Sequence, residues 1–323
     1  MGESVKAPNI LTVDVEDWYH ILELGDSSAR AGSGELESRV VANTERLLGL
    51  FDEAGARATF FVVGWVAWEH PDLVRRIAAA GHELASHSFW HEVIGRHDRA
   101  SLAADLAGSK KLLEDLGGVP VRGFRAPGAS VTEQTAWAFD VIVEQGFAYD
   151  ASLCPGYSSH GGFRSPYLGP HKVRCGAGEL VELPSSTLGV GHRRVPYAGG
   201  GYLRLFPYSL VRAAIAHDNR RGRPVNVYLH PREIDPAQPR MELPLKRRFK
   251  YYVGLETTER KVGSLLRDHD FVSAWDWIAD HAKQLDDQVL DVRAQASSSP
   301  PRPDPALVPP SPPAGPPPGR ITS

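Results

Sequence analysis

The chain of 323 residues has an ordinary globular composition, with 42% hydrophobic residues, 23% charged residues and a net charge of −3. This balance excludes the strongly basic surface typical of nucleic-acid-binding proteins, and no apolar run approaches the roughly 18 residues of a membrane span. Eleven of the 26 prolines fall between Pro300 and Pro318, so a globular body is followed by a Pro-rich segment. The N-terminus lacks the apolar core of a signal peptide, and we expect a cytoplasmic protein whose two cysteines, Cys154 and Cys175, are reduced.

Strand and helix patterns alternate along most of the chain. In chain order we expect strand 9–15, helix 39–54, strand 58–63, helix 72–80, strand 82–86, helix 101–116 with Ser101 as N-cap, strand 121–125, helix 132–145 with Thr132 as N-cap, strand 147–149, helix 209–219, strand 225–229, helix 257–268, strand 271–273 and helix 275–284. Repeated strand–helix units predict an α/β fold with a parallel sheet, as either a barrel or an open doubly wound sheet.

The stretch 154–201 interrupts this alternation. It is rich in Gly, Pro, Ser and His and contains one strand-like run at 179–183. Because the stretch is too long for a passive connection, we expect a surface element close to a functional site.

Four of the predicted strands end in titratable or cationic residues. The first ends in Asp14, Glu16 and Asp17, and the others end at His87 with His91, at Arg125 and at His230. Because the carboxyl ends of parallel strands meet at one rim in either architecture, these groups are expected to converge there.

The pair His87 and His91 is a candidate metal site, since two imidazoles four residues apart can bind one cation from a helical turn or a tight loop. The spacing alone is weak evidence for metal binding. The alternative is that both histidines are exposed in a loop and bind no metal. A zinc-type catalytic site needs a third ligand, and Glu16 and Asp17 both compete for that place. Trp18 and Trp90 are candidates for a sugar-binding groove, with burial in the core as the alternative.

Four segments together resemble the NodB-homology polysaccharide deacetylases of carbohydrate esterase family 4. They are TVDVEDWYH (12–20), SHSFWH (86–91), FRAPG (124–128) and VYLHP (227–231). The later segments GGGYLRLFPYS (199–209) and HPREIDPAQPR (230–240) resemble the deacetylases associated with the exosortase/PEP-CTERM system. The resemblance extends over about residues 9–280.

The resemblance implies a distorted (β/α)7-type barrel and hydrolysis of N-acetyl groups on a glycan. Asp14 matches the catalytic base, Arg125 the arginine that holds this base, and His230 the general acid. His87 and His91 match the metal histidines, with Glu16 or Asp17 as the third ligand of a divalent cation, Zn²⁺ first and Co²⁺ or Mn²⁺ as alternatives. Substrate contacts are expected from Trp18, Trp90, Pro127 and Tyr202. Two departures from the family pattern are Val15 in place of a metal-binding aspartate and Arg232 in place of a tryptophan.

The resemblance also sets the expected organisation and partners. A catalytic domain is expected at 8–285, with a subtype-specific part at about 200–280, followed by a disordered Pro-rich tail at 293–323. The expected partner is an N-acetylated glycan. The sequence does not indicate a partner for the Pro-rich tail. Association with a membrane through a polysaccharide assembly system would fit this subtype. The alternatives are an O-acetyl esterase, a metal-free cyclic-amide amidohydrolase and a non-catalytic carbohydrate-binding protein.

Overall fold

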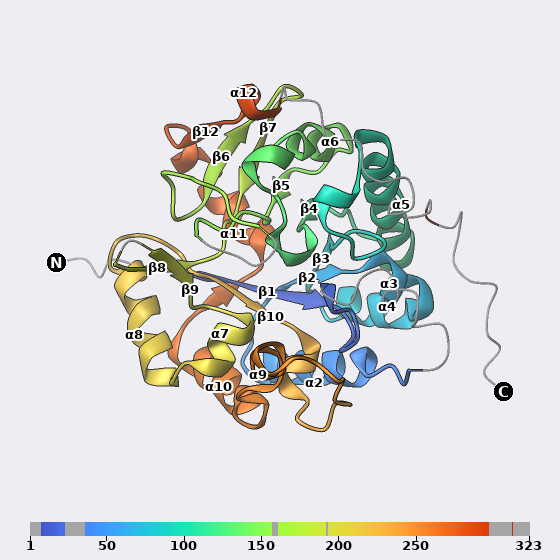
Figure 1. Cartoon of the computed structure of the whole chain (residues 1–323), viewed down its shortest axis with the longest axis vertical. Helices are drawn as coiled ribbons and strands as arrows, with labels where there is room; N and C mark the ends of the chain where they lie inside the picture. Colours follow the sequence, from blue (N-terminus) through green and yellow to red (C-terminus); the bar gives the residue numbers. More distant parts are fainter. Residues whose placement is uncertain (1–7, 23–35, 157–160, 192, 297–311, 313–323) are drawn as a thin grey trace.

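A ten-stranded, mostly parallel sheet surrounded by helices forms the body of the protein (Figure 1). The computed structural model describes residues 8–22, 36–156, 161–191, 193–296 and 312. The strands are β1 (Asn9–Val15), β2 (Thr59–Val62), β3 (Glu83–Ser86), β4 (Gly123–Phe124), β5 (Tyr149–Asp150), β6 (His171–Arg174), β7 (Glu179–Glu182), β10 (Asn226–Leu229), β11 (Phe271–Val272) and β12 (Val289–Asp291). Their order is β10-β1-β2-β3-β4-β5-β7-β6-β12, with β11 beside β1.

The strands from β10 to β7 pair in parallel, which confirms the predicted α/β class with a parallel sheet. Pairing among the described strands does not close this sheet into a ring. Instead, hydrogen bonds join β10 to the residues that follow β7, the two outer strands of the parallel part. Asn226 of β10 donates from Nδ2 to the carbonyl oxygen of Leu183, just beyond β7, at 2.9 Å, and its amide donates to Oγ of Ser186 at 2.9 Å. The strand order is therefore that of a seven-stranded barrel with a bridged opening.

The sheet buries both of its faces, because its strands are apolar on both sides. Neighbouring residues of β2 show this, since Phe60 packs into the cluster beneath the helices while Phe61 packs into a second cluster with Ile10 and Tyr149. The second cluster contains residues from β1, β2, β3, β5 and β7 and is completed by Trp277 of α11 (Ala274–His281). This inner face carries the functional side chains, because Asp14 lies four residues beyond Ile10 on the same side of β1.

The remaining helices are α2 (Val40–Glu53), α3 (Gly64–Glu69), α4 (Pro71–Ala79), α5 (Arg99–Gly117), α6 (Ala138–Glu144), α7 (Gly200–Leu205), α8 (Tyr208–Asn219), α9 (Leu245–Tyr252), α10 (Leu255–Asp268) and α12 (Arg293–Ala296). Short 3₁₀ turns are η2 (Ile94–Arg96), η3 (Pro127–Ala129), η4 (Glu133–Thr135), η5 (Pro231–Ile234) and η6 (Ala282–Leu285). In the described part of the chain no helix has both the length and the apolar character needed to cross a bilayer.

One predicted helix start and the continuity of one predicted helix are wrong, whereas Thr132 is an N-cap as predicted. Asp98, not Ser101, caps α5, because its carboxylate accepts the amide of Ser101, whose hydroxyl accepts the amide of Asp98 in return. The expected helix 132–145 is split into η4 and α6, since Thr132 and Thr135 form a reciprocal cap that closes after a single short turn.

The stretch 154–201 contains more strand structure than its sequence indicates. Besides β7 it forms β6 and the hairpin of β8 (Thr187–Val190) and β9 (Arg193–Pro196). Most of the tail predicted at 293–323 lies outside the described residues. Its described Pro312 lies against Gly108 of α5, where an added Cβ would come within 2.6 Å of the proline ring.

Candidate active site

The acidic residues at the end of β1 and just after it point to different places. Asp14 and Glu16 line the same cavity, because the amide of Glu16 donates to the carbonyl oxygen of Asp14 at 3.1 Å in a tight turn. Asp17 instead accepts hydrogen bonds from the amides of Arg39 and Val40 and from the hydroxyl of Ser38. Its carboxylate therefore satisfies the amides at the start of α2.

The histidine pair lies in a tight loop after β3, not on a helix. Ser88 and His91 both adopt left-handed backbone conformations, with φ of 63° and 57°, and the hydroxyl of Ser88 accepts the amide of His91 at 2.9 Å. Asp105 of α5 accepts the amides of Phe89 and Trp90 at 2.8 and 3.2 Å. A buried carboxylate thus holds the loop in a strained shape, which is typical of functional loops.

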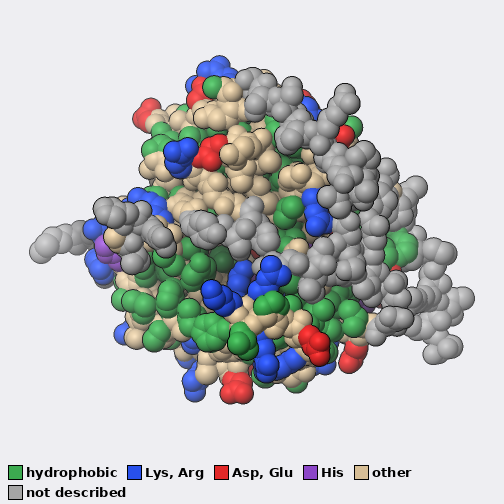
Figure 2. Space-filling view, viewed as in Figure 1, with side chains coloured by type: hydrophobic (Ala, Val, Ile, Leu, Met, Phe, Trp, Pro, Cys, Tyr) green, Lys and Arg blue, Asp and Glu red, His purple; other side chains and the backbone are tan. Residues whose placement is uncertain are grey.

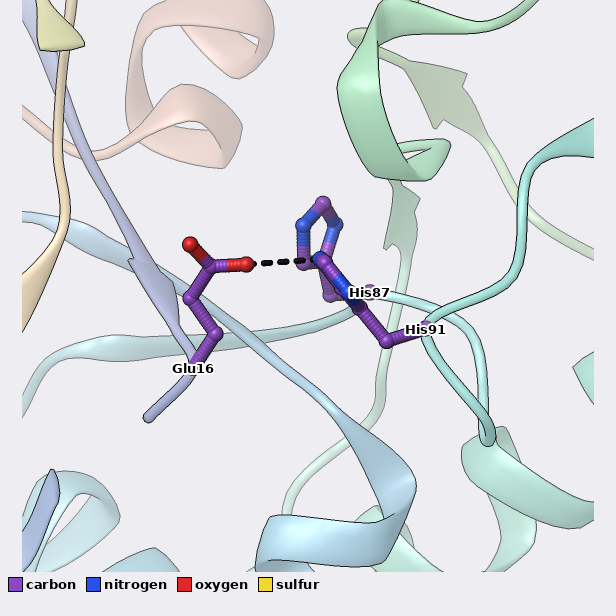
Figure 3. A group of neighbouring side chains, drawn as sticks. All are labelled: Glu16, His87 and His91. Carbon is purple, nitrogen blue, oxygen red and sulfur yellow. Dashed lines mark ion pairs between the residues drawn. The ribbon is translucent and has the colours of Figure 1, made fainter. Parts of the chain in front are cut away.

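Ligand atoms of Glu16, His87 and His91 lie within 4.8 Å of one another (Figure 3). Oε2 of Glu16 is 2.6 Å from Nε2 of His91. His87 donates from Nδ1 to the carbonyl oxygen of Arg125 at 2.8 Å, which leaves its Nε2 lone pair free to bind a cation. Two imidazoles and one carboxylate are a donor set suited to a catalytic divalent cation with an open coordination position.

Burial and neighbouring charges favour the ligating forms of these groups. Burial lowers the pKa of His87 to about 4, so the imidazole is neutral near pH 7. Burial raises the pKa of Glu16, but His91, His230 and His87 outweigh it and hold this pKa well below its ordinary value. A neutral imidazole and an ionised carboxylate are the forms that bind metal ions.

Asp14 lies beside this group and is held by Arg125. The guanidinium donates to Oδ1 of Asp14 at 2.6 Å and to the hydroxyl of Thr12 at 3.0 Å, and it lies 4.1 Å from the ring centroid of Phe61. Arg125 follows β4, where an added Cβ on Gly123 would come within 2.0 Å of Tyr149. Only glycine fits at that position beside the buried ring of Tyr149.

His230 follows β10 and completes the set. Its Nε2 is 3.8 Å from Oδ2 of Asp14 and 3.7 Å from Oε1 of Glu16. Burial lowers the pKa of His230, but Glu16, Glu233 and Asp14 together raise it to about 9. The structure therefore brings the predicted residues Asp14, Glu16, His87, His91, Arg125 and His230 into one cavity of about 420 Å³.

Three buried residues of the site were not predicted from the sequence. Glu233 lies behind His230, with Oε1 3.6 Å from Nδ1 and Oε2 accepting the amide of His230 at 3.2 Å. Arg204 donates from Nε to Oε1 of Glu233 at 3.1 Å. His20 lines the cavity and accepts the amide of Asp17 at Nδ1, which places a proton on Nε2, and Nε2 bonds to no other described residue. The sequence signal for Glu233 and His20 was their place within the quoted motifs.

The predicted substrate contacts divide into two groups. Tyr202 lines the cavity, whereas Trp18, Trp90 and Pro127 are absent from its described lining. Trp18 is buried and donates from its indole nitrogen to the carbonyl oxygen of Glu37 at 3.0 Å. Trp90 stacks on Trp65 at a centroid distance of 5.5 Å. Both rings therefore pack against other groups outside the described lining of the cavity.

Arg232, which departs from the family pattern, also lines the cavity. Its guanidinium lies 4.9 Å from the ring centroid of Tyr251 and donates to the carbonyl oxygen of Tyr251 at 3.3 Å. Burial lowers the pKa of this guanidinium. The departure therefore places a buried cation of η5 in the cavity wall.

Comparison with known protein families gives two matches. Residues 33–143 match the family model described as "Polysaccharide deacetylase", and residues 151–279 match "Domain of unknown function (DUF3473)". A chitooligosaccharide deacetylase of Rhizobium leguminosarum bv. trifolii is 38% identical over 63 residues, which are 20% of this chain and 29% of the relative. A peptidoglycan-N-acetylglucosamine deacetylase of Bacillus cereus is 28% identical over 96 residues, which are 29% of this chain and 35% of the relative. The matched part is therefore only about a third of either relative.

Solved structures support the fold. A protein from Mycobacterium smegmatis classed as a polysaccharide deacetylase superposes with a TM-score of 0.60 at 22% identity, over 90% of this chain and 96% of that one. A second such protein, from Pseudomonas aeruginosa PAO1, gives a TM-score of 0.54 at 13% identity, over 85% and 90% of the two chains. At these identities the likeness establishes the fold alone.

Proposed function

We propose that the chain is a metal-dependent hydrolase that removes N-acetyl groups from amino sugars of a polysaccharide or its precursor and releases acetate. The match of residues 33–143 to polysaccharide deacetylases supports this proposal. One observation carries this proposal. Three convergent ligand donors lie in the same buried cavity as a carboxylate–arginine pair and a histidine next to that carboxylate.

Glu16, His87 and His91 would hold the divalent cation. A cation bound there supplies Lewis acidity, which polarises an amide carbonyl and makes water a better nucleophile near neutral pH. The chemistry of the donor set fits Zn²⁺, with Co²⁺ and Mn²⁺ as alternatives. Asp17 is the weaker candidate for the third ligand because its carboxylate already accepts several hydrogen bonds at the start of α2.

Asp14 accepts the proton of the attacking water. Arg125 fixes the orientation of this carboxylate through the 2.6 Å hydrogen bond. Arg125 is itself held by the hydroxyl of Thr12 and by the carbonyl oxygen of Ala151, so the pair is preorganised. A positioned general base of this kind contributes about 10²–10⁴-fold to the rate.

His230 donates a proton to the departing amine, which is too poor a leaving group to depart unprotonated. Glu233 holds the imidazole from behind, so that Nε2 faces the cavity. His20 offers a neutral Nε2–H group to a substrate oxygen. Tyr202 and Arg232 line the wall where the rest of the glycan would lie.

We also propose that residues 8–285 act as one catalytic unit. His230, Tyr202 and Glu233 belong to the segment that matches DUF3473, whereas His87 and Arg125 belong to the segment that matches polysaccharide deacetylases. Neither segment alone would enclose the cavity. The stretch 154–201 contributes Cys154, Ser185 and Pro196 to the cavity wall, which supports its role as the element that sets glycan specificity.

The test is a substrate panel assayed with the metal-loaded enzyme. N-acetylated chitooligosaccharides, peptidoglycan fragments and O-acetylated xylan would be compared for acetate release, and free amine would be measured in parallel. The proposal predicts equal amounts of acetate and amine from an N-acetylated substrate. Acetate released only from the O-acetylated glycan would identify an esterase, and binding of glycans without any release would identify a carbohydrate-binding protein.

A further inference from the structure

Apolar side chains are exposed on one face of the protein. Of the five large hydrophobic side chains that are exposed in the described part of the chain, four lie on α7, α8 and α9. They are Leu205, Leu210, Leu245 and Phe249, and Leu245 is 82% exposed. Figure 2 shows hydrophobic side chains gathered over these helices, with Lys and Arg side chains among them. We call this surface the α9 face.

The α9 face is also locally basic in a chain whose net charge is −3. The segment 240–252 contains five basic residues and one acidic residue. Lys246, Arg247, Arg248 and Lys250 are all exposed on α9. This excess of positive charge is complementary to an anionic surface.

The arrangement on α9 is amphipathic and firmly held. Leu245 and Phe249 lie four residues apart, so they share one side of the helix. Arg204 donates to the carbonyl oxygens of Lys250, Tyr251 and Val253, which fixes the end of α9 against α7. The exposed apolar side chains are therefore part of an anchored helix.

The α9 face borders the catalytic cavity. Leu205 and Phe249 both line its wall, together with Lys250 and Tyr251. Anything that covers the α9 face would therefore lie beside the opening through which a glycan reaches His230.

We propose that the α9 face binds the surface of an anionic lipid bilayer, with Leu245 and Phe249 inserted among the acyl chains and the basic side chains at the headgroups. Interfacial helices combine apolar and Lys/Arg-rich sides in this way, and anionic headgroups attract each added cation. An aliphatic side chain as exposed as Leu245 gains little from a hydroxyl-rich glycan, whereas burial among lipid chains removes its apolar area from water. Such docking would present the cavity to a glycan attached to a membrane lipid.

The test measures binding of the full chain to vesicles by flotation, without substrate. Phosphatidylcholine vesicles with and without phosphatidylglycerol would be compared for the wild type, for Leu245→Ser and for the double variant Arg247→Gln/Arg248→Gln. We expect binding only to the anionic vesicles, weaker binding at high salt, and a loss on the order of tenfold or more in the double variant. Leu245→Ser should also weaken binding, while the controls Val119→Ser and Lys283→Gln, on exposed residues outside the α9 face, should not.

Several results would overturn the proposal. One is wild-type protein that does not bind anionic vesicles, and another is binding that the α9 variants leave unchanged. Binding to a soluble polyanion such as heparin, without binding to vesicles, would assign the face to an acidic polymer if the same charge variants weakened it. A dimer in sedimentation velocity that Leu245→Ser dissociates would assign it to a second copy of the chain. Because no deacetylation is measured, these outcomes are independent of the proposed hydrolysis.

Discussion

Nδ1 of His230 lies 3.6 Å from Oε1 of Glu233, a carboxylate three residues further along the chain whose other oxygen accepts the amide of His230. Glu233 is buried and is itself held by Arg204. The imidazole is thus fixed from behind while Nε2 faces Asp14 and Glu16 across the cavity.

Glu233→Gln should lower the rate of acetate release from an N-acetylated sugar by about tenfold to a hundredfold, because His230 loses the charge that orients and stabilises its protonated form. The same variant should hydrolyse an aryl acetate at close to the wild-type rate, since an aryl oxide leaves without a proton. The two substrates would be assayed side by side, with Glu256→Gln on α10 as the control. Equal losses on both substrates would show that Glu233 supports the fold of the cavity rather than proton donation.

Asp14→Asn should reduce kcat by about 10²–10⁴-fold, because an amide cannot accept the proton of water. Arg125→Lys should retain more activity, since a lysine keeps the charge beside Asp14 but loses the planar fork that also reaches Thr12 and Ala151. Metal content and thermal stability would be measured for each variant. A folded, metal-loaded Asp14→Asn protein with wild-type kcat would contradict the assignment.

Glu16→Gln should affect metal binding, whereas Asp17→Asn should affect thermal stability. Glu16→Gln should weaken Zn²⁺ binding by tenfold or more, measured by calorimetry, with little change in thermal stability of the metal-free protein. Asp17→Asn should lower thermal stability, because the carboxylate accepts the amides at the start of α2, and should leave Zn²⁺ affinity close to that of the wild type. The reverse pattern would make Asp17 the ligand.

Much of the site could be predicted because each strand end carries its own motif. The positions of Asp14, His87, Arg125 and His230 follow from the parallel sheet, whose carboxyl ends meet at one rim. The choice between Glu16 and Asp17 could not be made in the same way. It depends on the turn between Asp14 and Glu16, a local backbone detail that alternation along a strand does not specify.

The features that sequence patterns missed have physical reasons. In the sequence, Glu233 cannot be distinguished from other acidic loop residues. It contacts His230 only because the short turn η5 folds its side chain back toward the imidazole. Helix α9 has only eight residues, Leu245–Tyr252, and this segment is too short for the spacing of its apolar residues to indicate a helix. The contacts of Trp18 with Glu37 and of Trp90 with Trp65 depend on the folded chain, so no sequence pattern could locate them.

His82 should make folding sensitive to acid. It is buried between Phe51 and Phe60 and accepts the amide of Ala58 at 3.2 Å, and burial lowers its pKa to about 4. Because the folded pKa lies below the ordinary value of about 6.5, this contribution to stability is complete above pH 6.5 and is lost as the pH falls toward 4.

Thermal unfolding between pH 7.5 and 4 tests this expectation. The melting temperature of His82→Asn should be lower at pH 7.5 but should fall less steeply than that of the wild type on acidification. Other buried histidines and carboxylates contribute equally to both proteins, so the difference between the two curves isolates His82. Parallel curves would show that protonation of His82 is not linked to unfolding.

Acetate release from N-acetylated chitooligosaccharides by chelator-treated enzyme, before and after addition of Zn²⁺, tests the central claim most directly. We expect the treated wild-type enzyme to lose activity and to regain it with Zn²⁺, and we expect His87→Ala to remain inactive at the same Zn²⁺ concentration. Full activity in enzyme shown by elemental analysis to contain no metal would contradict a metal-dependent deacetylase built on Glu16, His87 and His91.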